Sequence, residues 1–293
     1  MYNKFIKNGN MTYSIDKIRL KTYITYSTFS KIEFRFSTVW KEYLKKSYTT
    51  GKVSNYKYNY NVELEEGRSF FFGFFHNTEI PSFWDTIKKY SFYIEFNPNK
   101  IKDDKILMYL LSISTEWYIR SYDLAVDVET SILNLIVDKS GKRLLHTISG
   151  GGDNLTYMSG KGDGRFKVYN KKRESDLQIR GELTRIEISR SLEDFNILNI
   201  EKYKYDGLFP EIYLNNYVMT LDDYGNETFL AILYAVQNGY PINSLSRVYK
   251  DKIKKMFEGG YKIEFSSDIA KDILKETIYF YFKSNPKILW DRS

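Results

Sequence analysis

Two neighbouring segments with strict alternation constrain the fold of this chain more than any other feature. In residues 183–190, Arg185, Glu187 and Ser189 fall on one face of a strand, because the side chains of a strand point alternately to its two sides. In residues 165–173, one face carries Arg165, Lys167, Tyr169, Lys171 and Arg173. If a short turn joins the strands, a carboxylate, a phenol and several cations come together. Such a face either is the solvated side of an antiparallel sheet or holds a phosphate and a divalent metal.

The composition limits the chemistry of such a face. The 293 residues include no cysteine, which excludes disulfides, thiolate zinc sites and cysteine nucleophiles and fits a cytoplasmic protein. The two histidines, His76 and His146, are too far apart in sequence to form a local ligand pair. A metal site would therefore depend on carboxylates, which favours Mg²⁺ or Mn²⁺. The net charge of +7 favours anionic partners, and residues 161–190 contain nine basic against five acidic side chains.

The wider pattern predicts an α+β fold, a central antiparallel sheet flanked by helices, with a helical C-terminal region. We expect strands at residues 12–26, 62–75 (two, around Glu66-Gly67), 91–97 and 121–129, and hairpins around residues 144–164. We expect helices at residues 38–48, 103–120, 192–205, 229–239, 242–260 and 267–282.

The same pattern predicts the organisation of the chain. We place a domain boundary near residue 205, with a sheet domain at 1–205 and a helical region for DNA binding or assembly at 206–293. No internal repeat is visible. The first residues lack the apolar core of a signal peptide, and no apolar run is long enough to span a membrane.

Four segments in order resemble a known pattern: Tyr93–Ile101, Ser121–Val128, Arg165–Glu174 and Leu183–Ser189. The order is similar to that of the initiator proteins of rolling-circle replication, namely the Rep_trans family of plasmids and the replication endonucleases of filamentous phages. The resemblance covers about residues 12–200. The His-hydrophobe-His metal motif of the wider superfamily is absent, as it is in the plasmid subgroup.

The resemblance implies a nicking-rejoining endonuclease. Such enzymes bind a replication origin, cut one DNA strand with a tyrosine and stay attached through a phosphotyrosine bond, while a divalent metal, here Mg²⁺ or Mn²⁺, polarises the phosphate. It implies DNA as the partner, with a host helicase and a second copy of the chain as further candidates and no membrane.

The resemblance assigns roles to individual residues. Tyr169 is the first candidate for the nucleophile, with Tyr203 and Tyr205 as alternatives. Because the free pKa of tyrosine is about 10, nearby positive charge is needed, and Lys171, Lys172 and Arg185 would supply it. The candidate metal ligands are Asp123, Asp127 and Glu187, with His146 as a further candidate. Independently of the resemblance, the excess of positive charge in residues 161–190 makes Lys161, Arg165, Lys167 and Arg173 the candidate DNA contacts.

Each assignment has an alternative. Tyr169 can be a packed strand aromatic, one of 27 tyrosines, and Glu187 can form a structural salt bridge with Arg185 or Arg165. The whole chain can be a sequence-specific DNA-binding initiator or regulator that does not nick.

Overall fold

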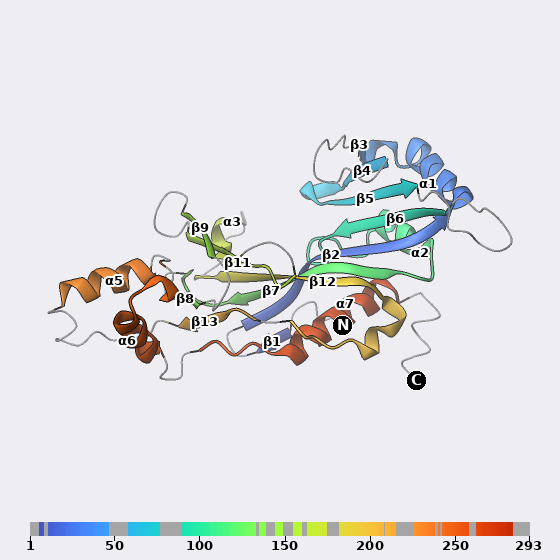
Figure 1. The fold of residues 1–293 in the computed structure, drawn as a ribbon. Helices are drawn as coiled ribbons and strands as arrows, with labels where there is room; N and C mark the ends of the chain where they lie inside the picture. The colour runs from blue at the N-terminus through green and yellow to red at the C-terminus, as the bar shows by residue number, and fades with distance from the viewer. Residues whose placement is uncertain are drawn as a thin grey trace.

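The computed structural model describes residues 6–8, 11–46, 58–76, 89–132, 135–138, 144–148, 155–159, 163–174, 182–207, 209–214, 226–237, 240, 242–257 and 262–283. The fold is α+β, as predicted, and is built on one large antiparallel sheet (Figure 1). The strands are β1 (Ile6–Asn8), β2 (Met11–Thr25), β3 (Leu44–Lys46), β4 (Tyr58–Glu63), β5 (Ser69–His76), β6 (Lys89–Phe96), β7 (Tyr118–Val128), β8 (Leu135–Asp138), β9 (Leu144–Ile148), β10 (Leu155–Ser159), β11 (Phe166–Asn170), β12 (Thr184–Asn196) and β13 (Glu211–Leu214). The α-helices are α1 (Tyr26–Thr38), α2 (Lys105–Ser112), α3 (Lys171–Glu174), α5 (Glu227–Gln237), α6 (Arg247–Phe257) and α7 (Ser267–Tyr281).

The order of strands in the large sheet is β3-β4-β5-β6-β2-β7-β12-β11-β10-β9, with β1 paired to β2 outside this path. This order contains the same topological unit twice, once on each side of the central β2–β7 pair. Each unit consists of an inner strand followed along the chain by a meander. On each side, the inner strand pairs with the last strand of a meander: β2 with β6 and β7 with β12. The sequence, in which no repeat is visible, did not predict this repeated topology.

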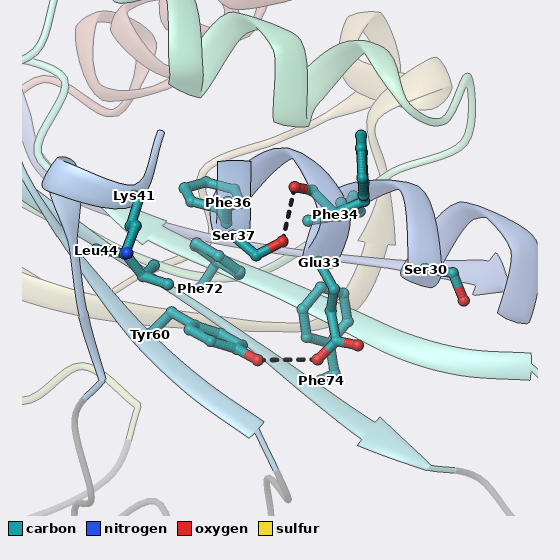
Figure 2. A pocket seen from close by; sticks show the side chains of 11 residues that line it. Ser30, Glu33, Phe34, Phe36, Ser37, Lys41, Leu44, Tyr60, Phe72 and Phe74 are labelled. Atoms are coloured by element: carbon teal, nitrogen blue, oxygen red, sulfur yellow. Dashed lines mark hydrogen bonds between the residues drawn. The ribbon is translucent and has the colours of Figure 1, made fainter. Parts of the chain in front are cut away.

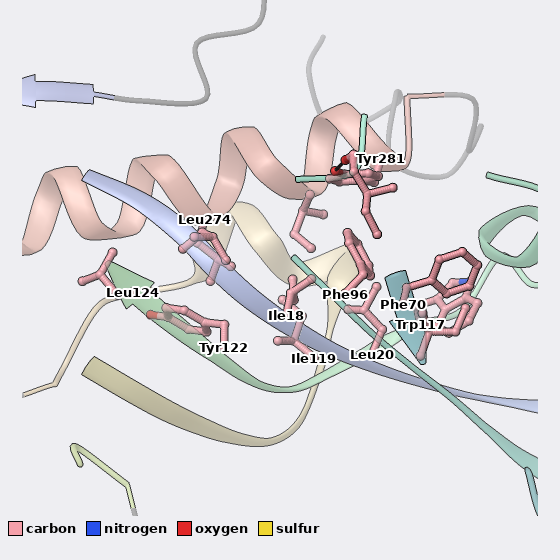
Figure 3. Packing of buried hydrophobic residues seen from close by; sticks show 14 of the residues in the cluster. Ile18, Leu20, Phe70, Phe96, Trp117, Ile119, Tyr122, Leu124, Leu274 and Tyr281 are labelled. Atoms are coloured by element: carbon pink, nitrogen blue, oxygen red, sulfur yellow. Dashed lines mark hydrogen bonds between the residues drawn. The ribbon is translucent and has the colours of Figure 1, made fainter. Parts of the chain in front are cut away.

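One face of the sheet is covered by helix α7 (Figure 3). Its residues Leu274 and Ile278 are buried, as are Ile18 and Leu20 of β2. Tyr281 at the end of α7 donates hydrogen bonds to the carbonyl oxygens of Pro98 and Ile101. Because side chains of β2 alternate between the two faces, its polar side chains lie on the face opposite α7, which is the polar face of the central strands.

The first helix lies earlier in the chain than the sequence predicted. The expected helix at 38–48 is wrong, because α1 spans 26–38 and is followed by the 3₁₀ turn Lys41–Tyr43. Thr25 caps α1, its Oγ1 accepting from the backbone N–H of Thr28. Helical spacing then buries Phe29, Ile32 and Phe36 against the sheet.

Two further predicted helices differ from the structure. The helix predicted for 103–120 ends at Ser112, since residues from Tyr118 onward join β7. The helix predicted for 192–205 is replaced by the end of β12 and the 3₁₀ segment Ile197–Lys202. The predicted strands at 12–26, around Glu66-Gly67 (itself the 3₁₀ turn Glu65–Gly67), at 91–97 and at 121–129 are confirmed.

The C-terminal part divides into two packing units. Helices α5 and α6, linked by the 3₁₀ turn Ile242–Ser244, form a small cluster around Phe229, Val236, Ile242 and Ile253. Helix α7, in contrast, belongs to the core of the large sheet. The predicted boundary near residue 205 therefore does not separate the packing of 1–205 from that of 206–293. Within the described residues, every helix is too short or too polar to cross a membrane.

Candidate active site

The polar face of the sheet gathers most of the predicted site residues. The strand register places Tyr169 of β11 opposite Arg185 of β12, and Arg185 opposite Asp127 of β7. In the next row on the same face, Lys167 lies opposite Glu187. The alternation predicted for residues 165–173 is confirmed as far as Asn170, where β11 ends, and that predicted for residues 183–190 is confirmed in β12. The register brings polar side chains of three strands together on one face.

Tyr169 and Glu187 are in direct contact. The phenol Oη of Tyr169 donates a hydrogen bond to Glu187 Oε1, and the Lys167 Nζ atom lies 4.0 Å from the centre of the Tyr169 ring. Tyr169 is buried, with 5% of its surface exposed. A carboxylate that accepts a hydrogen bond from a phenolic hydroxyl is placed to act as the general base that activates a tyrosine.

Arg185 is held by two aspartates. Its Nε and Nη2 donate to the two carboxylate oxygens of Asp127, each at 2.6 Å, and its Nη1 donates to Asp16 Oδ1 at 3.0 Å. Asp16 also accepts from the side-chain amide of Asn97 at 3.1 Å. The Arg185 side chain is 7% exposed, so these charge-assisted bonds fix the guanidinium beside Tyr169.

Asp16 occupies a β-bulge. The β2–β7 register passes from Ile15 opposite Leu124 to Lys17 opposite Asp123, which leaves Asp16 as the extra residue of β2. A bulge redirects a side chain locally, and this one directs Asp16 toward Arg185. Sequence reasoning missed Asp16, although the alternation of Ser14 and Asp16 against Tyr13 and Ile15 already places it on the polar face.

The electrostatic environment affects Glu187 and Arg185 in different ways. Burial raises the pKa of Glu187 above the usual glutamate value, and the charge of Asp16 adds to the rise, while the hydrogen bond from Tyr169 and the charge of Lys167 oppose it. For Arg185, burial alone would lower the pKa, but the bonds to Asp127 and the charge of Asp16 raise it. Arg185 therefore stays a cation, while Glu187 is better able to accept a proton.

The predicted metal ligands do not form one cluster. Asp123 lies on the same face as Glu187, and its Oδ2 is 3.9 Å from Lys17 Nζ. Both carboxylate oxygens of Asp127 accept hydrogen bonds from Arg185, so Asp127 is an ion-pair partner of Arg185, and its role as a metal ligand stays a prediction. In the described part of the chain, no three His, Asp or Glu side chains come close enough to hold a metal ion. The described carboxylates therefore do not form the three-residue metal site that the sequence predicted.

The remaining candidates are spread around this site. Strand β11 ends at Asn170, whose side chain accepts from the Lys172 backbone N–H at 3.0 Å, so Lys171, Lys172 and Arg173 begin the short helix α3 instead of extending the strand. Lys171 Nζ lies 5.9 Å from the Tyr169 ring centre. Arg165 is exposed and donates to Ser189 Oγ at 3.3 Å. Lys161 lies outside the described residues, as do the side chains of Arg173 and His146.

The alternative tyrosines lie on the other face. Tyr203 shares a 2.6 Å hydrogen bond with Tyr122, whose side chain points away from Asp123 along β7, and the Arg190 guanidinium lies 5.3 Å from the Tyr205 ring centre. Burial raises the pKa of Tyr203 and of Tyr205. Neither phenol therefore shares the surface that carries Glu187.

A separate cavity of about 770 Å³ opens between α1 and strands β4 and β5 (Figure 2). Its walls include Phe36, Phe72 and Phe74, and Tyr60 Oη donates to Glu33 Oε1 at 3.2 Å. Phe72 and Phe74 alternate with Phe71 and Gly73, so this cavity lies on the helix-covered side of the sheet. It is distinct from the polar face around Tyr169.

Similarity to known proteins is found among solved structures. No family model matches the chain, and no curated protein matches it. Among solved structures, a rolling circle replication initiator protein from Geobacillus stearothermophilus is similar over 85% of this chain and 97% of its own, with 12% identity and a TM-score of 0.39. With so low a TM-score, the roles of individual residues rest on the geometry of this chain.

Proposed function

We propose that this protein is a replication initiator of the rolling-circle type that binds origin DNA on the polar face of its sheet and nicks one strand with Tyr169. The observation that supports this proposal most directly is the contact between the Tyr169 phenol and Glu187, beside Lys167 and Arg185. A nucleophile, a base and two cations on adjacent strands are the groups that attack on a phosphodiester requires.

The proposed step is a transesterification. The Tyr169 oxygen forms a bond to phosphorus while the bond from phosphorus to one bridging oxygen of the DNA backbone breaks. The phenolic proton passes to Glu187, and the departing oxygen takes a proton from solvent. The reverse reaction rejoins the strand. Lys167 and Arg185 would stabilise the charge that develops on the phosphate oxygens.

A divalent metal stays a prediction. When bound, Mg²⁺ or Mn²⁺ would polarise the phosphate, and of the three predicted ligands Asp123 and Glu187 are the two that Arg185 does not engage. A titration of nicking with Mn²⁺ in wild type and in Asp123→Asn tests this assignment. A host helicase and a second copy of the chain likewise stay candidate partners.

The decisive experiment uses supercoiled plasmid that carries the cognate origin. The wild-type protein is expected to convert it to the open-circular form and to remain covalently attached to DNA on a denaturing gel. Tyr169→Phe should lose both the nick and the adduct, while Tyr203→Phe, which removes a hydroxyl from the opposite face, should retain them. Equal adduct yield from Tyr169→Phe would refute the assignment.

A second candidate function is sequence-specific DNA binding without nicking. The small exposed fraction of Tyr169 and the engagement of its hydroxyl by a carboxylate favour this alternative, because a phosphate must reach that oxygen. Tight, salt-dependent binding of origin DNA with neither nick nor adduct would support it.

A further inference from the structure

The repeated topology of the sheet relates the candidate site to a second position on the same face. The first half comprises β2 and β4–β6, and the second comprises β7 and β10–β12. Lys17 and Asp123 face each other at the centre, 3.9 Å apart. A pseudo-two-fold axis perpendicular to the sheet passes between them, so the two halves present equivalent positions on one face.

The strand registers define which residues correspond. Ile94-Glu95 of β6 matches Ile186-Glu187 of β12, since each glutamate lies on the polar face of the last strand of its meander. On the neighbouring outer strands, Phe71 of β5 lies opposite Glu95, and Lys167 of β11 lies opposite Glu187 in the same way. Two residues further along the outer strand, Gly73 occupies the position that Tyr169 has in the second half. The first half therefore keeps the glutamate but has no side chain at the position of Tyr169, while Tyr93, opposite Gly73, has the position of Arg185.

The inner strands of the two halves carry opposite charge. Inward from the glutamates, Arg19 of β2 corresponds to Ala125 of β7. Two residues to either side, Lys17 and Lys21 correspond to Asp123 and Asp127. Three cations thus replace two carboxylates and an alanine. Glu95 orients Arg19 through a 2.6 Å contact, and the side chains of Lys17 and Arg19 are each 41% exposed.

Exposed aromatic rings extend the same face. Tyr23 and Phe75 lie on either side of Ser91 in one row of the register, and they are 39% and 40% exposed. The rings of Tyr23 and Tyr118 are 6.4 Å apart, edge to face, and Lys21 Nζ lies 5.0 Å from the Tyr23 ring centre. Cations followed by exposed aromatic rings are the combination with which proteins bind single-stranded nucleic acid, through backbone contacts and base stacking.

We propose that the first half of the sheet is a binding site for single-stranded DNA, in which Lys17 and Arg19 contact phosphates and Tyr23 stacks on a base. The proposal rests on the proposed function, because the strand bound here would continue the one presented to Tyr169. From strand spacing and rise, Glu95 and Glu187 lie roughly 20 Å apart, so one oligonucleotide reaches both positions. Because Gly73 stands at the position of Tyr169, the proposal assigns strand binding, and not cutting, to this half.

The test measures binding of a fluorescein-labelled single-stranded oligonucleotide by anisotropy, in a Tyr169→Phe background that prevents chemistry. Lys17→Ala with Arg19→Ala should weaken binding, and the slope of log K against log salt should fall by about 1.4, or about 0.7 for each lost phosphate contact. Lys262→Ala is the matched control. Lys262 is similarly exposed, at 44%, and pairs with a glutamate, Glu211, at 3.3 Å, but it does not belong to the proposed binding surface.

The aromatic contribution is tested separately. Tyr23→Ala should weaken binding about tenfold, the usual effect of losing one stacked base, while Tyr240→Ala, which removes a ring that is 48% exposed outside the sheet, should not. Unchanged binding in both the Lys17/Arg19 variant and Tyr23→Ala would overturn the proposal. So would a parent protein that binds only duplex DNA, or that binds no DNA at all.

The outcome is separable from that of the nicking assay. If the parent binds single strands through Lys17, Arg19 and Tyr23 but wild type never forms an adduct, the binding site stands and the nicking function fails. If Tyr169 forms an adduct while these variants bind as the parent does, the nicking function stands and the binding site fails.

Discussion

Replacing Asp127 with alanine tests whether this side chain is an ion-pair partner of Arg185 or a metal ligand. In the structure, Asp127 accepts two hydrogen bonds of 2.6 Å from a guanidinium that is 7% exposed. Removal of one partner of a buried pair leaves an uncompensated charge, at a cost of about 3–5 kcal/mol. Because Asp16 would still accept from Arg185, we expect a loss of about 3 kcal/mol in the free energy of unfolding.

Two companion variants show how large the loss in the free energy of unfolding should be for a weaker contact and for removal of the whole pair. Asp16→Ala removes a single 3.0 Å bond from Arg185, so we expect a smaller loss of about 1.5 kcal/mol. The double replacement Asp127→Leu with Arg185→Met exchanges the pair for apolar side chains, and its cost should be below that of Asp127→Ala alone.

The assay is urea unfolding followed by circular dichroism, with EDTA present so that no divalent ion contributes. A loss below about 1 kcal/mol for Asp127→Ala would refute the ion-pair assignment, since a buried pair costs more than this to break. A metal ligand, in contrast, would leave the metal-free protein unchanged and would reduce only the stabilisation by Mn²⁺.

Three further predictions concern other parts of the molecule. The pKa of Glu187 is raised in the folded protein. Its carboxyl group therefore contributes stability that is present below the ordinary pKa of about 4.3 and is lost as the pH rises through the folded pKa. Glu187→Gln should accordingly raise the melting temperature near neutral pH but not near pH 4. Gly207→Ala should destabilise the fold by about 1–3 kcal/mol in denaturant titration, since an added Cβ would lie 2.3 Å from Arg190 Nη1; an unchanged midpoint would count against this packing. Leu274→Ala, fully buried between α7 and β2, should cost about 2–5 kcal/mol, and a smaller effect would mean that α7 does not belong to the main core.

The part of the site that the sequence predicted is the part that depends on local alternation. Tyr169 and Lys167 share a face, as do Arg185 and Glu187, because a period of two is a property of each strand alone. Asp127 could be placed on a face in the same way. Its pairing with Arg185 could not be predicted, because that depends on which residues of β7 and β12 lie opposite each other.

The features that the sequence did not predict depend on longer-range relationships. The bulge at Asp16 is set by the pairing of β2 with β7, strands that are distant in sequence. Helix α1 begins at Tyr26 because Thr25 caps it and Phe29 and Phe36 pack on β5. In contrast, none of residues 38–44, the part of the predicted helix 38–48 whose burial the structure describes, is buried. The repeated topology leaves no repeat in the sequence, because the two halves share little more than an isoleucine-glutamate pair at equivalent positions.

The most direct test of the account is to identify the residue that becomes attached to DNA. Wild-type protein would be incubated with an origin oligonucleotide and Mn²⁺, digested with nuclease and protease, and analysed by mass spectrometry. The account predicts a single modified peptide in which Tyr169 carries the residual nucleotide. Modification of Tyr203, Tyr205 or another residue, or nicking with no covalent attachment, would contradict it.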